Sequence, residues 1–556
     1  MKRSIALWLL AGWLLPPSVL PAASAPPRLD AFRRVLVMDQ GRLKPMDTFA
    51  RNLLKQFSGR ARPDGIDACA WLSRVLFAPG TGAGDAVFLV RQPELLDAIG
   101  ATNAGRGRYT HAQLRPGLGR LHELAFRSSS RDEQDLERVE FEALRLFYNL
   151  SAYHGLLHSF AFALGGAAGG TRGPSSLPAI IPLAGDSWLS PGRALAGGTP
   201  LPEAVQAEMA LLATAARAYG QNDHAAFDRA LAGFNRSVRG RLGPDAPRPW
   251  KISLEVLYNR AGPFFMAGLA YGLALLLLLL SMACCRSLLA QMAAWSAATG
   301  FLAHTLGIIA RMLISGRPPV TNLYETFVFV AWTAAALGLV MARLQKQGPG
   351  LAAGALAAAA LLVVSGRYAL AGDTMGMLTA VLDSNLWLAT HVVTIALGYA
   401  GCVVAGIIGH ALIIQAMRGR GDAVAGSARL LYAVLAFGLV FTVIGTLMGG
   451  IWADQSWGRF WGWDPKENGA LLIIAWCAAL FHARPAGWLG PIGLAAGAVG
   501  AMITVALAWF GVNLLGLGLH AYGFTRGALR GLLAFLAVEL AFLAVAVPLA
   551  RKRIRA

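Results

Sequence analysis

A short segment of the chain concentrates tryptophans and charged side chains, a combination that suits a large planar ligand. It spans residues 452–467 and reads WADQSWGRFWGWDPKE. Flat indole faces stack on planar rings, and guanidinium or ammonium groups hold carboxylates. Tryptophans also line membrane interfaces, but that role explains only some of the rings and none of the charges among them. We predict that this segment binds the ligand through the following residues: Trp452, Trp457, Arg459, Phe460, Trp461, Trp463, Asp464, Lys466 and Glu467.

Two histidines and one proline-containing loop are expected at the same membrane face as this segment. His391 lies near the start of a long apolar segment, and His520 follows the text GLGL between two apolar segments. Two neutral imidazoles on either side of an aromatic platform suit the axial positions of an iron porphyrin. Packing or hydrogen bonding is the alternative for each histidine. The loop at 317–325 either covers the platform or is an ordinary turn.

Several other polar residues have both a functional and a structural interpretation. His482 closes an apolar segment near the opposite face and is a candidate iron ligand there, whereas His410 is expected to snorkel or hydrogen-bond. Glu539, deep in an apolar segment, is either functional or paired with a neighbouring helix. His154 and His158 share a helix face, where they either bind a metal or are ordinary surface residues.

The composition makes hydrocarbon the expected solvent for much of the chain. Of its 556 residues, 56% are hydrophobic and 14% are charged, whereas soluble domains have about 25% charged residues. The net charge of +19 does not indicate a nucleic-acid partner, because basic residues gather in loops between long uncharged runs, as membrane topology requires. The five cysteines form no C-x-x-C pair, which argues against a dithiol redox centre and a covalent haem attachment motif in this chain.

The chain divides into three parts. Residues 1–25 place basic, apolar and small residues in the order of a secretory signal, with an uncleaved anchor as the alternative. Residues 26–260 carry frequent charges and show helical spacing of apolar residues, so we expect a mostly helical extracytoplasmic domain. Residues 261–556 form a multi-span membrane domain that contains the tryptophan loop at 450–467.

We expect about nine membrane-spanning helices in this last part, each near the ~20 residues needed to cross a bilayer. The basic residues after position 550 and in the loops near 343, 418 and 484 belong on the cytoplasmic side. The tryptophan loop and residues 26–260 then lie outside. The sequence therefore predicts an all-α polytopic membrane protein with these spans: 264–283, 290–310, 326–342, 350–365, 386–413, 430–449, 467–483, 487–510 and 531–550.

The tryptophan loop closely resembles that of the WWD-domain haem-handling family, and more narrowly that of the CcsA (ResC) group of cytochrome c biogenesis proteins. The matching text is WGRFWGWDPKE at 457–467, supported by PVTNLYE at 319–325, WLATH at 387–391, and GVNLLG and LHAYG within 511–523. The resemblance implies haem b as substrate and ligand. It also implies that His391 and His520 are the external axial ligands of the iron and that His482 is a ligand on the cytoplasmic side.

The resemblance further implies a holocytochrome c synthase in the bacterial inner membrane. Such a protein carries haem to the outer face and presents it for thioether attachment to the CxxCH motif of apocytochrome c. In the family, the second ligand of the inner haem site comes from a CcsB (ResB) half, and residues 1–260 contain no such multi-span half. We therefore expect a separate CcsB-like partner, besides apocytochrome c and membrane lipid.

Two segments resemble the extracytoplasmic part attached to CcsA-type domains in some fused forms. They read DQGRLKPMDT at 39–48 and EVLYN at 255–259, and no chemistry follows from them. Two other functions stay open. One is a haem transporter or chaperone without synthase activity, and the other is a haem-b electron-transfer subunit of the membrane.

Overall fold

The computed structural model describes residues 29–82, 84–102, 105, 107–132, 135–163, 177–183, 187–196, 200–345, 348–378, 384–512 and 528–555. These residues form two compact units. The N-terminal unit holds the described residues up to Ala261 together with Ala369–Met377. The bundle unit holds Gly262–Tyr368 and the described residues from Leu378 onward. The expected signal or anchor at 1–25 lies outside the described residues.

In its described residues, the N-terminal unit is mostly helical with short antiparallel strand pairs. The strands pair as β1 (Leu36–Asp39) with β2 (Arg42–Pro45), β3 (Phe88–Leu89) with β4 (Arg108–Tyr109), and β5 (Ile181–Pro182) with β6 (Trp188–Leu189). The α-helices are α2 Asp30–Arg33, α3 Met46–Ser58, α4 Ala68–Phe77, α5 Pro79–Gly82, α6 Pro93–Ile99, α7 His111–Leu114, α8 Leu118–Ser128, α9 Arg138–His158, α10 Pro191–Ala196, α11 Glu203–Gly220, α12 His224–Leu242 and α13 Pro249–Ala261.

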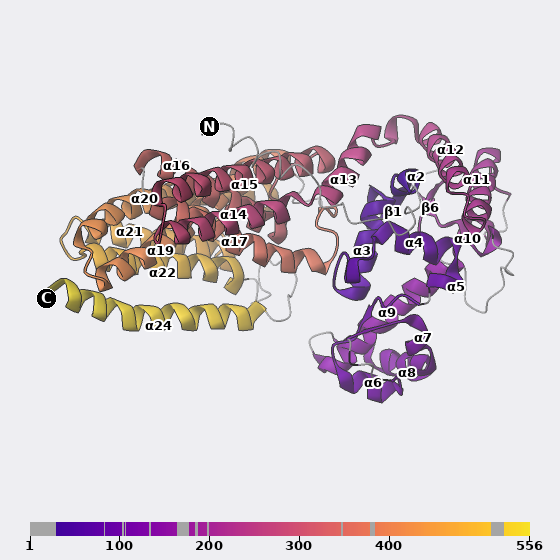
Figure 1. Ribbon diagram of the computed structural model, residues 1–556, viewed down its shortest axis with the longest axis horizontal. Coiled ribbons are helices and arrows are strands. Elements are labelled where there is room, and N and C mark those ends of the chain that lie inside the picture. The colour runs from indigo at the N-terminus through magenta and orange to yellow at the C-terminus, as the bar shows by residue number, and fades with distance from the viewer. Residues whose placement is uncertain are drawn as a thin grey trace. The chain divides into compact units, whose positions relative to one another are not determined.

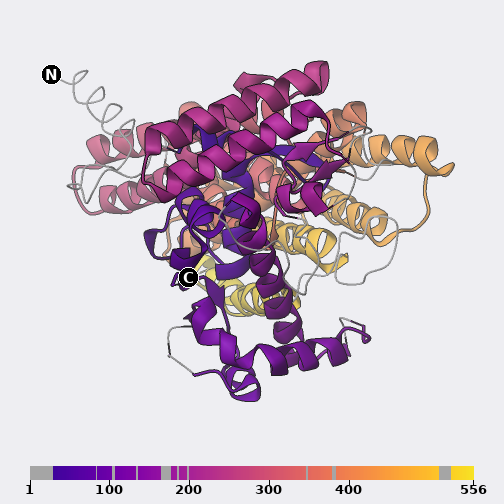
Figure 2. The same cartoon turned by 90° about the vertical axis from the view of Figure 1, so that its right-hand side faces the viewer.

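The β1–β2 hairpin turns through Gln40 and Gly41, whose φ angles are 52° and 76°. Positive φ at both central residues is the geometry of a two-residue turn that matches the twist of its strands. The chain then enters α3 directly after Pro45. The core beside α3 is aromatic, and the Phe57 ring lies 5.4 Å from that of Phe88 in a stacked arrangement. Helices α11 and α12 pack side by side (Figure 2).

A buried network of charges joins the hairpin and α3 to α13. The carboxylate of Asp47 accepts hydrogen bonds from Arg33 and Arg51, each at 2.7 Å. Arg42 donates to both carboxylate oxygens of Glu255 at 2.9 Å. The two motifs without evident chemistry, at 39–48 and 255–259, therefore supply opposite sides of one ion-paired network.

The bundle unit consists of long helices, which Figure 1 shows lying side by side. They are α14 Pro263–Ser281, α15 Arg286–Ser315, α16 Leu323–Gln345, α17 Gly348–Tyr368, α18 Asn385–Trp387, the π-helical turn η8 Leu388–Val392, α19 Val393–Met417, α20 Gly421–Trp457, α21 Pro465–Ala483, α22 Pro491–Ala506, the π-helical turn η9 Leu507–Gly511, and α24 Ala528–Arg555.

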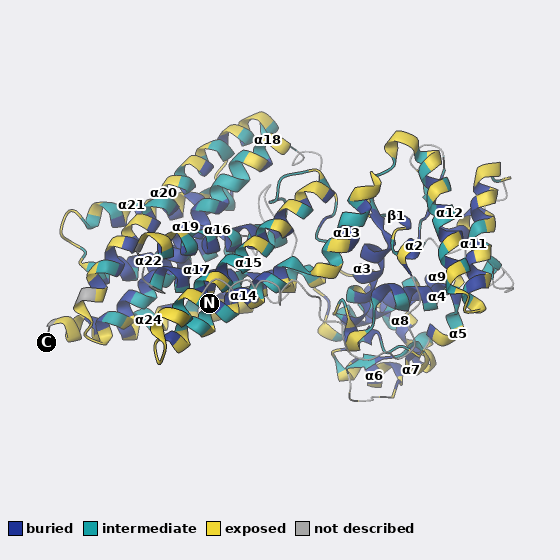
Figure 3. Cartoon of the chain, turned by 45° about the horizontal axis from the view of Figure 1, so that its top comes forward, coloured by how far each residue is buried: buried dark blue, intermediate teal, exposed yellow. Residues whose placement is uncertain are grey.

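Eight helices of the described chain are long and apolar enough to cross a membrane. The segment expected as a further span, 467–483, forms α21 but is not among the eight. Polar residues at both of its ends shorten its apolar run. Most residues along α24 are exposed or half-buried (Figure 3). The predicted all-α polytopic membrane fold is confirmed.

Glycines let α19 and α20 approach each other closely. A Cβ added to Gly401 would lie 2.7 Å from the backbone of Gly438, and one added to Gly445 would lie 2.9 Å from the backbone of Ile395. Small residues at such contacts are typical of membrane helices, which gain stability from close packing. This contact brings the start of α19 against the last turns of α20, where the candidate site lies.

Candidate functional site

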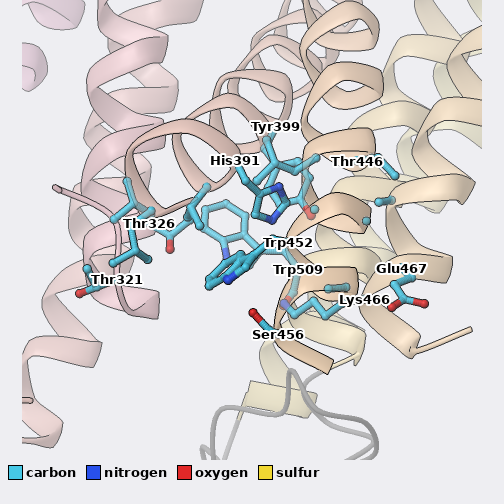
Figure 4. A pocket seen from close by; sticks show the side chains of 18 of the residues that line it. Thr321, Thr326, His391, Tyr399, Thr446, Trp452, Ser456, Lys466, Glu467 and Trp509 are labelled. Carbon is cyan, nitrogen blue, oxygen red and sulfur yellow. The ribbon is translucent and has the colours of Figure 1, made fainter. Parts of the chain in front are cut away.

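A cleft lies where one end of several bundle helices meets (Figure 4). It contains about 1340 Å³ of empty space, including the part open to solvent. Its lining includes Thr326 on α16, His391 on η8, Trp452 on α20, Lys466 on α21 and Trp509 on η9. Two of these residues sit on π-helical turns, a local geometry that is frequent at functional sites.

His391 is held in one orientation at the cleft wall. Its Nδ1 lies 2.7 Å from the carbonyl oxygen of Gly445. A carbonyl only accepts, so Nδ1 donates its proton there, and in the neutral ring the lone pair is on Nε2. Such a second hydrogen bond fixes the tautomer and the ring orientation of metal-binding histidines. The ring also lies on Gly449, where an added Cβ would be 2.6 Å from the His391 Cε1.

The tryptophans of the predicted binding segment divide into two groups. Trp452, Trp457 and Trp461 line the cleft, and the Trp452 ring lies 5.8 Å from that of His391 at 62°. Trp463 is 69% exposed, and neither it nor Phe460 lines the cleft. Helix α20 continues through Trp457, so the first half of the segment is helix and not loop. Residues 452–457 contain neither glycine nor proline, and Gly458 ends α20 with a φ of 69°.

The charged residues of the segment mostly hold the loop itself. Glu467 accepts a hydrogen bond from Arg459 at 3.1 Å and from the Gly462 N–H at 2.8 Å. Asp464 and Glu467 form a capping box at the start of α21, which satisfies backbone N–H groups that the helix leaves unpaired. The Arg459 guanidinium lies 5.8 Å from the centre of the Trp457 ring, in cation–π geometry.

Lys466 is the basic residue of the segment that lines the cleft. Its Nζ donates to the carbonyl oxygen of Trp509 at 3.2 Å. Desolvation lowers the pKa of Lys466 to about 8, against the opposing effect of the Asp464 carboxylate. An ammonium group in partly desolvated surroundings is well suited to bind a carboxylate.

One wall of the cleft, around Trp509, was missed by the sequence reasoning. Trp509 packs against Phe327 with ring centroids 4.5 Å apart and against Tyr399 at 5.8 Å. The aromatic residues around η9 were hidden inside an apolar span and gave no separate signal. The loop at 317–325 was noted as a possible cover, and Thr321 and Asn322 from it line the cleft.

A buried ion pair supports that loop. Arg311 donates to Glu325 at 2.6 Å, and the Thr321 N–H donates to the other carboxylate oxygen at 3.0 Å. Both ionic side chains are less than 5% exposed. Because breaking a buried pair leaves an uncompensated charge, this pair gives the loop a defined position beside the cleft.

The structure does not bring every candidate residue to the cleft. His482 lies exposed in the last turn of α21, and its Nδ1 donates to the Ala478 carbonyl at 2.8 Å. His520 lies outside the described residues. His154 faces His111, with the two Nε2 atoms 2.6 Å apart, rather than joining His158 in a metal site. In the described part of the chain, no group of three or more potential metal-ligating side chains occurs.

Comparisons with known proteins identify the family of this chain. Residues 320–520 match the family model described as cytochrome C assembly protein. The chain is 31% identical over 257 residues to the cytochrome c biogenesis protein CcsA of Parasynechococcus marenigrum, covering 40% of this chain and 83% of the relative. It is 30% identical over 256 residues to the CcsA of Synechococcus sp. (strain CC9605), covering 40% of this chain and 83% of the relative.

A third relative shows a similar level of identity. The CcsA of Chlamydomonas reinhardtii is 32% identical over 228 residues, covering 39% of this chain and 64% of the relative. The matched family region contains the cleft and most of the bundle unit, whereas the N-terminal unit precedes it except for residues 369–377. The chain is therefore a multi-pass membrane protein with a role in cytochrome c biogenesis, and it belongs to the CcsA family.

Proposed function

We propose that the cleft binds haem b and presents it for covalent attachment to apocytochrome c. The observation that carries this proposal is the orientation of His391. Its Nδ1–H is committed to the Gly445 carbonyl at 2.7 Å, so the ring's lone pair is on the nitrogen that an iron would take. The same ring lies beside Trp452 in the cleft.

The other cleft residues fit the rest of a haem. Trp452, Trp457 and Trp461 offer indole surfaces to the macrocycle, and Lys466 offers a cation to a propionate. Arg459 supports the site indirectly, because its hydrogen bond to Glu467 stabilises the loop. His520 is the proposed second axial ligand, on the basis of its expected position at the same membrane face.

The proposed reaction depends on positioning. Each thioether forms when the S–H of a cysteine adds across a vinyl C=C of haem, with sulfur bonded to one carbon and the hydrogen to the other. Nothing leaves, so the step needs no acceptor. Holding the vinyl groups beside the two thiols of a CxxCH segment converts an encounter into an effectively intramolecular reaction. The histidine of that segment then replaces one external ligand.

We further propose that the tryptophan end of the bundle faces outward from a bacterial inner membrane and that the C-terminus is cytoplasmic. The basic residues at the C-terminal end of α24 support this orientation. Haem then enters from the cytoplasmic side near His482, at the other end of α21. A CcsB-like membrane protein completes that inner site and the synthase.

The experiment compares His391→Ala with His158→Ala, an exposed histidine of the N-terminal unit. Each full-length variant is purified in detergent with its partner, and haem is quantified by absorbance. We expect His391→Ala to lose haem and to regain it when imidazole is added, because a free ligand can replace the missing side chain. His158→Ala should keep its haem. Unchanged haem content and spectrum in His391→Ala would overturn the proposal.

A second measurement separates synthase from chaperone. A host that carries only this chain and its CcsB-like partner is given a reporter apocytochrome c. Covalent haem on the reporter, lost in His391→Ala, supports the synthase. Bound haem without any covalent product means that the protein hands haem to another enzyme. Oxidation and reduction of the bound haem during quinol turnover would instead identify an electron-transfer subunit.

A further inference from the structure

A second polar site lies in the bundle unit, toward the opposite end of α19 from His391. His410 is 410 − 391 = 19 residues further along the chain, or roughly 28 Å along a helix. Its Nε2 lies 2.9 Å from a carboxylate oxygen of Glu539 on α24. Glu539 is 9% exposed. The site therefore lies apart from the cleft and plays no part in the function proposed above.

The hydrogen-bond geometry requires a proton between these two side chains. The Nδ1 of His410 lies 2.9 Å from the carbonyl oxygen of Gly406, so this nitrogen is a donor. A neutral ring then has its lone pair on Nε2, facing the lone pairs of the Glu539 carboxylate. The 2.9 Å contact is attractive only when one further proton is shared. That proton makes the pair either imidazolium and carboxylate or neutral imidazole and carboxylic acid.

We propose that His410 and Glu539 form a binding site for a single proton within the membrane bundle, and that the bound proton holds α24 against α19. The proton is exchanged with the aqueous phase and no other bond changes. An ionisable residue inside an apolar span is costly and is rarely retained without a role or a partner. Here each of the two residues is the partner of the other.

An aromatic ring and largely apolar helix sequences surround this pair. The ring of Phe542 covers His410, with centroids 4.5 Å apart. The sequences of α22 and η9 contain no titratable residue, and between 531 and 550 the sequence of α24 contains none besides Glu539. On α19 the other titratable side chains are Tyr399 and Cys402, eight or more residues nearer the cleft.

The remaining helices packed against α19 place their titratable groups elsewhere. Arg429 and Tyr432 of α20 lie near the level of His410 but are exposed. Glu325 of α16 is paired with Arg311 beside the cleft. The other titratable residues lie toward the ends of the helices. They are Tyr324 and Arg343 on α16, Arg367 and Tyr368 on α17, Asp422 and Asp454 on α20, Arg418 after α19, and Arg530, Arg551, Lys552, Arg553 and Arg555 on α24.

The matched variant is Glu539→Gln. The amide N–H₂ of glutamine can donate to the Nε2 lone pair of His410, so it reproduces the protonated contact without a titrating proton. Glu539→Leu cannot donate and breaks the contact. The two variants have similar volume, and only the glutamine can donate to His410, which separates the hydrogen bond from packing.

The test uses the full chain in lipid nanodiscs between about pH 5 and pH 10. Infrared difference spectra should show a carboxylic-acid or imidazolium band that disappears with rising pH, and this band should be absent from Glu539→Gln. The native protein binds the extra proton in its folded state, so the folding equilibrium constant should fall up to tenfold per pH unit from about pH 6.5, where an unfolded histidine loses its proton, up to the midpoint of the folded pair, and should level off above that midpoint. Thermal unfolding should therefore occur at lower temperature as pH rises.

For Glu539→Gln, thermal unfolding should lack this part of the pH dependence and should match the wild type measured at low pH. Glu539→Leu should unfold at lower temperature than Glu539→Gln throughout the range. The proposal is overturned if no titrating band distinguishes the wild type from Glu539→Gln. It is equally overturned if Glu539→Gln and the wild type lose stability with pH in parallel, because the proton would then reside elsewhere.

Discussion

The N-terminal unit and the bundle unit differ in what their clusters of polar side chains face. In the N-terminal unit the buried charges bond one another, as Asp47 does with Arg33 and Arg51 and as Arg42 does with Glu255. In the bundle unit, polar and aromatic side chains at the ends of several helices face a shared cleft. The first set therefore maintains a fold, whereas the second set is available to a ligand.

One short segment complicates this division. Residues 369–377 follow bundle helix α17 in the chain but belong to the N-terminal unit. There Asp373 accepts hydrogen bonds from Lys44 at 2.6 Å and from Arg42 at 3.3 Å. The hairpin motif at 39–48 therefore holds a segment from the membrane part of the chain, which gives that motif a structural role.

The largest expected effect is the loss of a buried charge from the N-terminal unit. Asp47→Asn leaves Arg33 and Arg51 without their shared carboxylate, and breaking such a buried pair costs about 3–5 kcal/mol. We expect hydrogen exchange in α3 to accelerate accordingly, as measured by mass spectrometry of the full chain. Asp64→Asn is the control, since this side chain is 70% exposed.

Asp47→Asn should leave haem binding unchanged. Haem content of the bundle should remain near that of the wild type, because Asp47 belongs to the N-terminal unit and the residues that line the cleft belong to the bundle unit. Loss of haem with unchanged exchange in α3 would contradict the division of roles.

The next effect concerns the contact between Gly449 and His391. Gly449→Ala places a methyl group 2.6 Å from the His391 Cε1 and must displace the ring. Overpacking of this kind costs about 1–3 kcal/mol, so haem affinity should fall roughly 5- to 150-fold by titration. Gly366→Ala in α17 is the control, because a Cβ there meets no atom within 4 Å. Equal affinity in both variants would show that the ring position does not matter.

The third prediction concerns how the protection of residues 369–377 depends on pH. Burial alone would raise the pKa of Asp373, but Arg42 and Lys44 outweigh it and hold the pKa well below its usual range. A lowered pKa in the folded state means that the stabilisation is complete above about pH 4 and is lost only as pH falls through the folded value. Exchange in residues 369–377 should thus be protected equally at pH 6 and pH 8.

Asp373→Asn should lose this protection at both pH values, because the amide keeps the shape but not the charge. The expected loss is about 1.5–3 kcal/mol, as for hydrogen bonds to charged groups. Protection in the wild type that declines between pH 8 and pH 6 would contradict the assignment.

The smallest effect is expected where the same kind of ion pair is exposed. Arg127 and Glu123 lie 3.8 Å apart on α8, with side chains 76% and 70% exposed. Arg127→Ala should change the stability of the N-terminal unit by less than about 0.5 kcal/mol, measured by exchange in α8 and α9. A change as large as that of Asp47→Asn would mean that burial does not separate the two classes of pair.

The sequence predicted most of the elements because the signals that define them are local. Long uncharged runs indicate spans, and the text from Trp452 to Glu467 marks a concentration of aromatic and charged residues before any folding is known. The boundary between α20 and the loop was placed too early, because membrane-interface tryptophans and polar residues resemble a loop in composition. The helix ends only at Gly458, where a positive φ requires it.

Tertiary packing determines which side chain each polar group contacts. It turned Arg459 toward Glu467, left Trp463 exposed, and added Trp509 to the cleft wall. It also paired His410 with Glu539, which are 129 residues apart, and Arg42 with Glu255, which are 213 apart. Hydropathy and periodicity depend on neighbours in the chain, so the sequence alone determined spans, composition and family. The partner of a polar group depends on which helices pack together, and that is settled only when the chain folds.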